Sequence, residues 1–143
     1  MVKLNDFKRY FEVLADEMGL CFLMVVMEEH LRKKLQGKAG TIMALVYPSA
    51  MGTGSADNTV DENICLLYVL ENGTKSGMTE KMEFKMYERL LEVIDGIKSK
   101  LIADADENHP LLRELERGSL EVEPEWNIAG GYNGYSLVFS FKK

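Results

Sequence analysis

The chain has few of the residues from which metal centres, disulfide scaffolds and membrane anchors are built. Its 143 residues include two cysteines, Cys21 and Cys65, and two histidines, His30 and His109. Zinc sites need spaced clusters of these residue types, and neither histidine has such a partner nearby in the sequence. No apolar run approaches the roughly 18 residues that a membrane span requires. We therefore expect no metal, no cofactor and no membrane partner.

The chain also lacks the excess of positive charge that a general nucleic-acid binder needs. It carries 23 acidic and 17 basic residues, a formal net charge of −6. Phosphate contacts require clustered Lys and Arg, so we expect no nucleic-acid partner. One local basic cluster is more typical of a solvated helix face: Arg32, Lys33, Lys34 and Lys38.

The cysteines indicate the compartment. Each lies within an apolar run, where free cysteine behaves as a small buried hydrophobe, so a disulfide between them is possible but not indicated. The first residues lack the charged-then-apolar pattern of a signal peptide. A cytoplasmic protein with reduced thiols is the expectation.

Hydrophobic periodicity predicts the secondary structure. Residues 4–18 have the spacing of an amphipathic helix, and 80–103 have that of a longer one. Residues 63–70 are expected to form a central strand, because both faces of the run 64–70 are apolar. Two alternatives stay open for 20–36, which is either a strand followed by a short helix or one helix. Further elements are expected as a strand at 41–47, a short helix at 111–116 and a β-hairpin at 120–141.

These elements predict one α+β domain over residues 1–143. Hydrophobic residues make up 46% of the chain, which is enough for a core without disulfides or metal. Strands separated unequally by helices favour a mixed or antiparallel sheet. We expect one long helix and shorter helices to pack on this sheet, with the C-terminal hairpin closing the chain.

Residues 48–60 form the part of the chain with the fewest large apolar groups. They are rich in Gly, Ser and Ala, and we expect a mobile loop there. Gly52-Thr53-Gly54-Ser55 is not a phosphate-binding loop, because no lysine or helix follows it. A loop of this kind can make contacts with a partner, so we assign a candidate interface to Met51, Gly52, Thr53 and Gly54.

Three aromatic residues of the C-terminal hairpin complete the candidate interface. Trp126 alternates with polar residues on the apolar side of its strand, so core packing is the first interpretation, with an interface as the alternative. Tyr132 lies in the glycine-rich turn, where it need not be buried, and Tyr135 begins the last strand. Aromatic residues at such positions are enriched in protein interfaces.

No catalytic motif is present. Asp104, Asp106 and Glu107 form an acidic cluster that is typical of a solvated helix end. A pair of one cysteine with one histidine is conceivable, but buried structural thiols are much more common. We therefore predict no catalytic residues and no enzyme activity.

The layout resembles a known family of structural proteins. The pieces that carry the resemblance are the strand ending Leu45-Val46-Tyr47-Pro48, the strand 64–70, the long helix, the segment Leu120-Glu121-Val122-Glu123-Pro124 and the last strand beginning Gly134-Tyr135. Over most of its length the chain is similar to small tail-terminator or head–tail connector proteins of tailed phages and prophages.

The resemblance implies a ring subunit, commonly of sixfold symmetry, that caps a tail tube and joins it to the capsid. It implies self-association, contacts with other tail or connector proteins, and a virion-associated location. The alternative is a binding module that recognises a peptide or small ligand in a groove beside residues 48–60.

Overall fold

The computed structural model describes the backbone of residues 3–55, 58–74 and 77–142, and their side chains outside 50–62. The α+β class and the long helix are confirmed. The elements follow in the order α1 (Leu4–Glu17), β1 (Cys21–Val25), α2 (Glu28–Leu35), β2 (Ile42–Val46), β3 (Ser49–Ser55), β4 (Asn58–Asn72), α3 (Glu80–Asp106), the 3-10 turn η1 (Arg117–Ser119), β5 (Glu121–Ile128) and β6 (Tyr132–Lys142).

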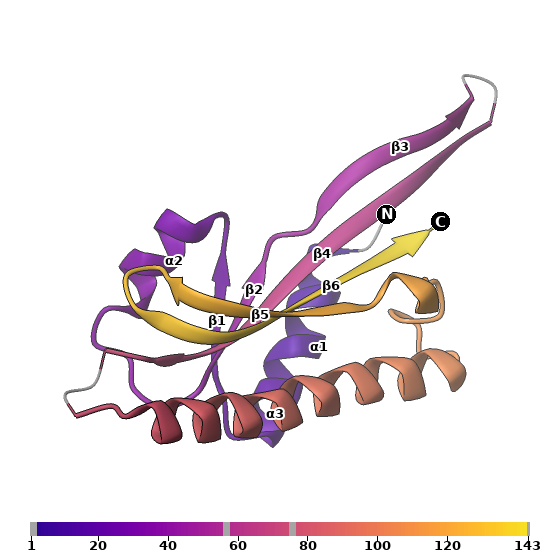
Figure 1. Cartoon of the computed structure of the whole chain (residues 1–143). Coiled ribbons are helices and arrows are strands. Elements are labelled where there is room, and N and C mark those ends of the chain that lie inside the picture. Colours follow the sequence, from indigo (N-terminus) through magenta and orange to yellow (C-terminus); the bar gives the residue numbers. More distant parts are fainter. Residues whose placement is uncertain (1–2, 56–57, 75–76, 143) are drawn as a thin grey trace.

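The strands form one mixed sheet around β4 (Figure 1). The strand order is β1-β2-β4-β6-β5, and β3 pairs with β4 beyond the end of β2. Among the described strand pairs, β1 and β2 run parallel and the others are antiparallel. β4 is flanked on both sides, as its doubly apolar sequence predicts.

Residues 48–60 were expected to form a loop, and this expectation is wrong for the described part. Ser49 to Ser55 pair with β4 from Ile64 to Asn58. Leu45 pairs with Leu67 and Ser49 with Ile64, so one extra residue bulges at the break between β2 and β3. Small residues give a segment little to bury, but a strand ladder needs only backbone groups, and β4 supplies them.

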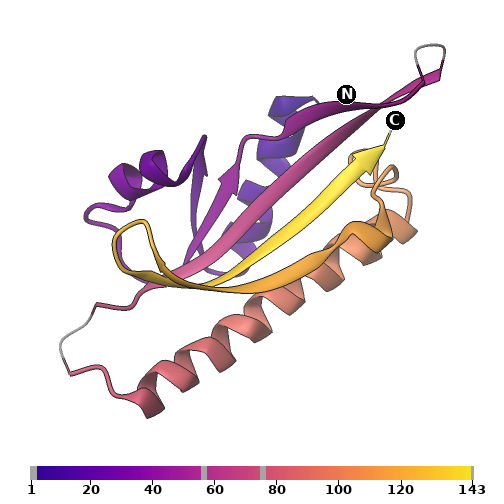
Figure 2. The same ribbon diagram turned by 45° about the horizontal axis from the view of Figure 1, so that its top comes forward.

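Helices cover the two faces of the sheet unequally (Figure 2). α1 and α3 lie on one face, where Phe7, Phe11 and Leu90 join Leu67 and Phe139 in the main core cluster. α2 packs on the other face in a smaller cluster that includes Leu31, Leu35, Ile42, Leu70 and Ala129. Among the described helices, none covers the rest of this second face, where Ile64, Leu66 and Val138 are only half-buried.

Local signals explain where the helices begin and end. Gly19 follows α1 with φ of +70°, a conformation that costs glycine little, and it separates α1 from β1. Residues 20–36 are therefore a strand followed by a short helix. Thr79 caps α3 by accepting a hydrogen bond of 3.2 Å from the amide of Met82. Within the described residues, no helix is long and apolar enough to cross a membrane.

The expected helix at 111–116 is a series of turns. Its first residues form short turns, in which the amides of Leu112 and Arg113 donate to the carbonyl of His109. Its end bonds to β6 instead: the amide of Glu116 donates to the carbonyl of Ser140 at 2.9 Å, and Leu115 forms a bridge with Phe141. Leu112 and Leu115 are buried there, so the tertiary partner overrides the local helical preference.

Candidate functional site

The β3–β4 ribbon is the first candidate. It consists of β3 paired with residues 58–64 of β4, and its outer part extends beyond the last residue of β6 that pairs with β4, Lys142 (Figure 1). The predicted interface residues Met51, Gly52, Thr53 and Gly54 all lie on β3, and their side chains fall outside the described residues. β3 pairs only with β4 among the described strands, so its other edge is open.

The three hairpin aromatics do not share one environment. Trp126 is 70% exposed, so the core interpretation is wrong. The hydroxyl of Tyr132 donates to the carbonyl of Leu35 at 3.3 Å, which attaches the hairpin turn to α2. Tyr135 is half-buried and contacts Tyr87 edge to face, with ring centroids 5.7 Å apart.

A register shift explains the exposure of Trp126. The pairing of β5 with β6 is irregular between Glu125 and Ile128, and Asn127 has φ of +56°. Val122 packs with the main cluster, whereas Ile128 packs with the cluster under α2, on the opposite face. Strict alternation therefore does not hold through the strand, and Trp126 sits at the irregularity on an edge strand.

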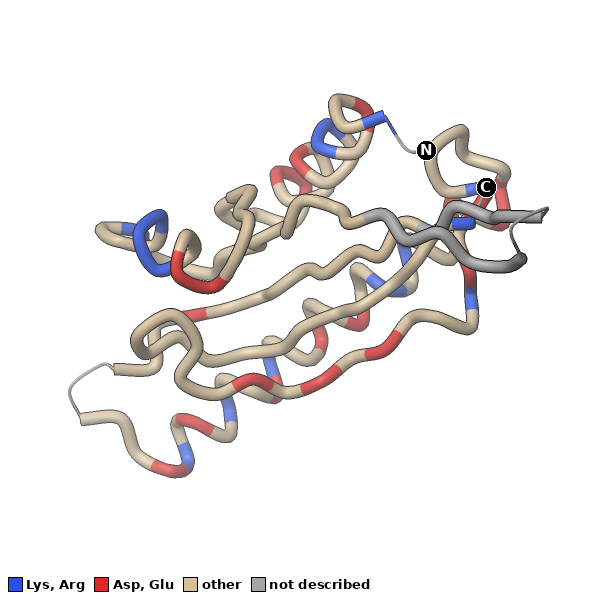
Figure 3. The backbone as a smooth tube through the Cα atoms, turned by 90° about the horizontal axis from the view of Figure 1, so that it is seen from above, with Lys and Arg blue, Asp and Glu red and all other residues tan. Residues whose placement is uncertain are grey.

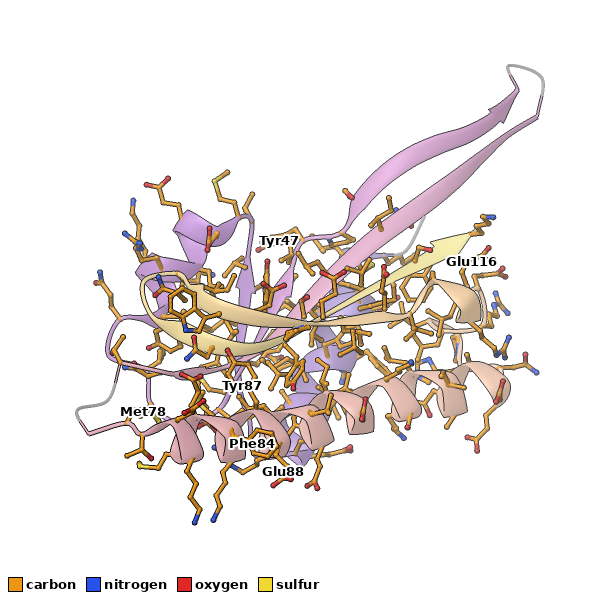
Figure 4. All side chains as sticks on the ribbon, viewed as in Figure 1. Tyr47, Met78, Phe84, Tyr87, Glu88 and Glu116 are labelled. Carbon is orange, nitrogen blue, oxygen red and sulfur yellow. The ribbon has the colours of Figure 1, made fainter. Side chains whose placement is uncertain are left out.

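One side of the β5–β6 hairpin packs against α3. Figure 4 shows Tyr87 reaching from α3 toward β5, and its hydroxyl donates to the carbonyl of Glu125 at 2.7 Å. Phe84, one turn earlier, is 68% exposed. Tyr87 thus joins α3 to β5 through this hydrogen bond. Burial, followed by the nearby carboxylate of Glu83, raises the pKa of its phenol.

A groove beside the base of the ribbon is the second candidate. It has a volume of about 1010 Å³ and lies between α1, the end of α3, the 109–114 turns and the end of β6. The hydroxyl of Tyr10 donates to Oδ2 of Asp104 at 2.5 Å, and Nζ of Lys100 lies 3.3 Å from Oδ1 of the same carboxylate. Burial, followed by the hydrogen bond to Asp104, raises the pKa of Tyr10.

The groove combines an apolar floor with charges of both signs on its rim. Leu14, Leu111 and Phe141 supply apolar surface, and Asn63 and Lys142 connect it to the ribbon. The rim carries Lys3, Asp6, Arg9, Glu17, Arg113 and Glu114. Such a lining suits a peptide-like ligand, which offers both apolar and polar groups. No local sequence pattern predicts this groove, because Tyr10 and Asp104 are 94 residues apart.

The thiols and histidines do not form a nucleophile–base pair in the described structure. Cys65 is buried on β4, its thiol contacts the carbonyl of Asn63 at 4.0 Å, and burial raises its pKa to about 12. Nδ1 of His109 accepts from the amide of Leu111 at 3.1 Å, and Nδ1 of His30 accepts from the amide of Val26 at 3.0 Å. Both histidines thus organise local backbone.

Two carboxylates of the acidic cluster at the end of α3 have hydrogen-bond or ion-pair partners. Asp104 accepts from Tyr10 and Lys100, and Asp106 forms an ion pair with Arg117. Across the described residues, no group of three His, Cys, Asp or Glu side chains is arranged to hold a metal ion.

A third, basic pocket lies at the other end of the sheet. It has a volume of about 680 Å³ between α2, the end of β4 and the β5–β6 turn. Arg32 and Lys38 line it together with Asn72, Gly130 and Tyr132. The described residues that form its lining include no Asp or Glu, so it favours an anionic group.

No known protein family, curated protein or solved structure matches this chain. The function is therefore argued from the three surfaces themselves. The predicted interface residues are not brought together: the ribbon lies at one end of β4, and the hairpin turn with Tyr132 pairs with Asn72 at the other.

Proposed function

We propose that this protein is a non-enzymatic assembly subunit that associates with further copies of itself, in the manner of a tail-terminator-like ring of a phage or prophage. The single observation that carries the proposal is the β3–β4 ribbon. Its outer part extends past the sheet, and β3 leaves one edge without a described strand partner. An extended, open-edged ribbon is suited to pairing with another chain.

The uncovered part of the sheet supports the same proposal. Ile64, Leu66 and Val138 are half-buried on the face that α2 covers only at one end. Apolar sheet surface without a covering layer is the kind of area that subunit contacts remove from water. Elsewhere on the surface, Tyr47 and Trp126 are exposed aromatic residues, at 42% and 70%.

Mass in solution tests the proposal. Light scattering after size exclusion, over a concentration series, should give a defined oligomer above the 16.2 kDa monomer. Replacing residues 52–61 by Asn-Gly shortens the ribbon with a two-residue hairpin turn that suits antiparallel strands. This variant should be monomeric while its thermal unfolding stays close to that of the original chain.

Trp126→Ala is a matched second variant. Because the indole is exposed, its loss should change the free energy of unfolding by no more than about 0.5 kcal/mol. If Trp126 lies in the subunit contact, the same change weakens association. A strict monomer for the original chain at all concentrations overturns the proposal.

The groove at the base of the ribbon supports a second candidate, a binding module for a peptide or small ligand. Its volume of about 1010 Å³ and mixed lining are suited to such a ligand. Thermal-shift screening with peptides that carry both charges and apolar groups tests it. Hits that disappear in Val13→Glu, a change at a half-exposed groove residue, would favour the binding module.

A further inference from the structure

The strongest unassigned feature is the group of positive charges around the basic pocket. Arg32, Lys33 and Lys38 are exposed, and none of them forms an ion pair with a described residue. Lys34 differs, since its ammonium donates to the carbonyl of Met24 at 2.6 Å. Figure 3 shows a basic stretch that follows an acidic one on α2, while acidic residues follow β5. In a chain with net charge −6, this is a local reversal of sign.

The opposite sign is concentrated at the other end of β4. Asp61 and Glu62 belong to β4 within the ribbon, and neither β3 nor residues 58–64 of β4 contain Lys or Arg. The backbone of β4 connects the two ends, because Asn72 lines the basic pocket and Asn58 to Glu62 belong to the ribbon. At about 3.3 Å for each residue, the strand spans roughly 46 Å.

We propose that the basic pocket between α2 and the β5–β6 turn receives the acidic ribbon of a second copy of this chain. The inference rests on the proposed function and names the surface that accepts the ribbon. Donor and acceptor lie at opposite ends of one subunit, so the contact is head to tail, and it forms a ring where the rotation between subunits closes. Opposite charges orient the approach and disfavour ribbon-to-ribbon contacts.

A glycine of the β5–β6 turn gives Arg32 room at the wall of the pocket. Gly130 lies on its wall with φ of +86°, and a Cβ built there would lie 3.3 Å from Nε of Arg32. Because Gly130 has no side chain, the guanidinium of Arg32 has room beside the turn. From there it can form a bidentate pair of hydrogen bonds with a carboxylate. Asn72 offers a neutral polar side chain at the same pocket.

A nucleic acid is the competing anionic occupant, and the charge distribution disfavours it. Nucleic-acid sites extend basic surface along many phosphates, whereas this pocket has two lining cations in an acidic chain. The test therefore includes a fluorescent single-stranded DNA as a probe.

Charge reversal tests the inference. The pocket variant carries Arg32→Glu with Lys38→Glu, and the ribbon variant carries Asp61→Lys with Glu62→Lys. Each should raise the concentration at which half of the chain assembles by at least about tenfold. A mixture of the two should assemble again, because each now supplies the charge that the other accepts. Lys81→Glu with Lys85→Glu reverses two exposed charges on α3 and serves as the control.

The outcomes separate the two proposals. If the original chain assembles and the pocket variant assembles equally well, the pocket inference is overturned and the assembly proposal stands. If the pocket variant loses only binding of the DNA probe, the inference is likewise overturned. If the original chain never assembles, the assembly proposal itself fails. Urea unfolding of each variant shows that a lost assembly does not come from a lost fold.

Discussion

The hydroxyl of Tyr10 donates a 2.5 Å hydrogen bond to Oδ2 of Asp104, and this contact ties the first helix to the last turns of α3. The Tyr10 ring also meets Phe11 and His109 edge to face, with centroids 5.1 Å and 5.2 Å away. Two helices that are far apart in the sequence are thus held together at the wall of the groove.

We expect Tyr10→Phe to lower the free energy of unfolding by about 1–2 kcal/mol. Phenylalanine keeps the ring contacts and removes only the hydrogen bond to a carboxylate, which then depends on Lys100 alone. Urea denaturation followed by circular dichroism measures the change. An unchanged midpoint would show that water replaces the hydroxyl without cost.

The same residue predicts a loss of stability at alkaline pH. Burial and the hydrogen bond to Asp104 raise the pKa of Tyr10 above its usual 10.0, so the folded chain retains a proton that the unfolded chain releases. This contribution is complete below pH 10 and is lost as the pH rises further. The free energy of unfolding should therefore fall as the pH rises above about 10, and less steeply in Tyr10→Phe.

Part of the alkaline slope should remain in that variant. Burial also raises the pKa values of Tyr68, Tyr87 and Tyr135, which Tyr10→Phe leaves in place. Identical slopes for the two proteins would contradict the assignment of the effect to Tyr10.

Gly134 should be the glycine least tolerant of a side chain. It pairs with Leu70, has φ of +157°, and a Cβ there would lie 1.9 Å from the carbonyl oxygen of Val69. Gly134→Ala must displace backbone at the centre of the sheet, and we expect a loss of at least about 2 kcal/mol in thermal or urea unfolding.

Gly118 provides the matched control for this change. It has no atom within 4 Å of a built Cβ, so Gly118→Ala should leave stability nearly unchanged. Equal free energies of unfolding for the two alanine variants would contradict the prediction that the close approach of β6 to β4 excludes a side chain at position 134.

The sequence sufficed for the elements whose own residues decide them. The run 64–70 is apolar on both faces and becomes part of the central strand β4, and the Thr79 cap begins α3 where the pattern places it. The Thr79 cap is a local interaction, and the position of β4 follows from the burial of both of its faces. The mixed α+β architecture follows from the order of these elements.

Three features depend on partners that periodicity does not record. Residues 49–55 form a strand because β4 extends to meet them, and Trp126 is exposed because the register shifts at an edge. The groove at Tyr10 and Asp104 joins residues 94 positions apart, which no local pattern predicts. For this reason, candidate sites that are made of long-range contacts were the feature least predictable from the sequence.

The two cysteines should react at very different rates. They lie on opposite faces of the sheet: Cys65 packs in the main core, whereas Cys21 is half-buried and packs beside the cluster under α2. The thiolate is the reactive form, and burial raises the pKa of Cys65 to about 12, so it is almost fully protonated near pH 8. Reaction of Cys65 also requires opening of the central strand.

A chromogenic disulfide reagent at about pH 8 should therefore label one thiol rapidly and the second at least about 100-fold more slowly. Cys21→Ser should remove the fast phase and leave the slow one, and denaturant should make both thiols fast in the original chain. Rapid labelling of Cys65 in folded Cys21→Ser would mean that β4 opens far more often than a strand paired on both sides should. Because β4 also connects the ribbon to the basic pocket, that result would indicate that the ribbon and the pocket are not held at a fixed distance from each other.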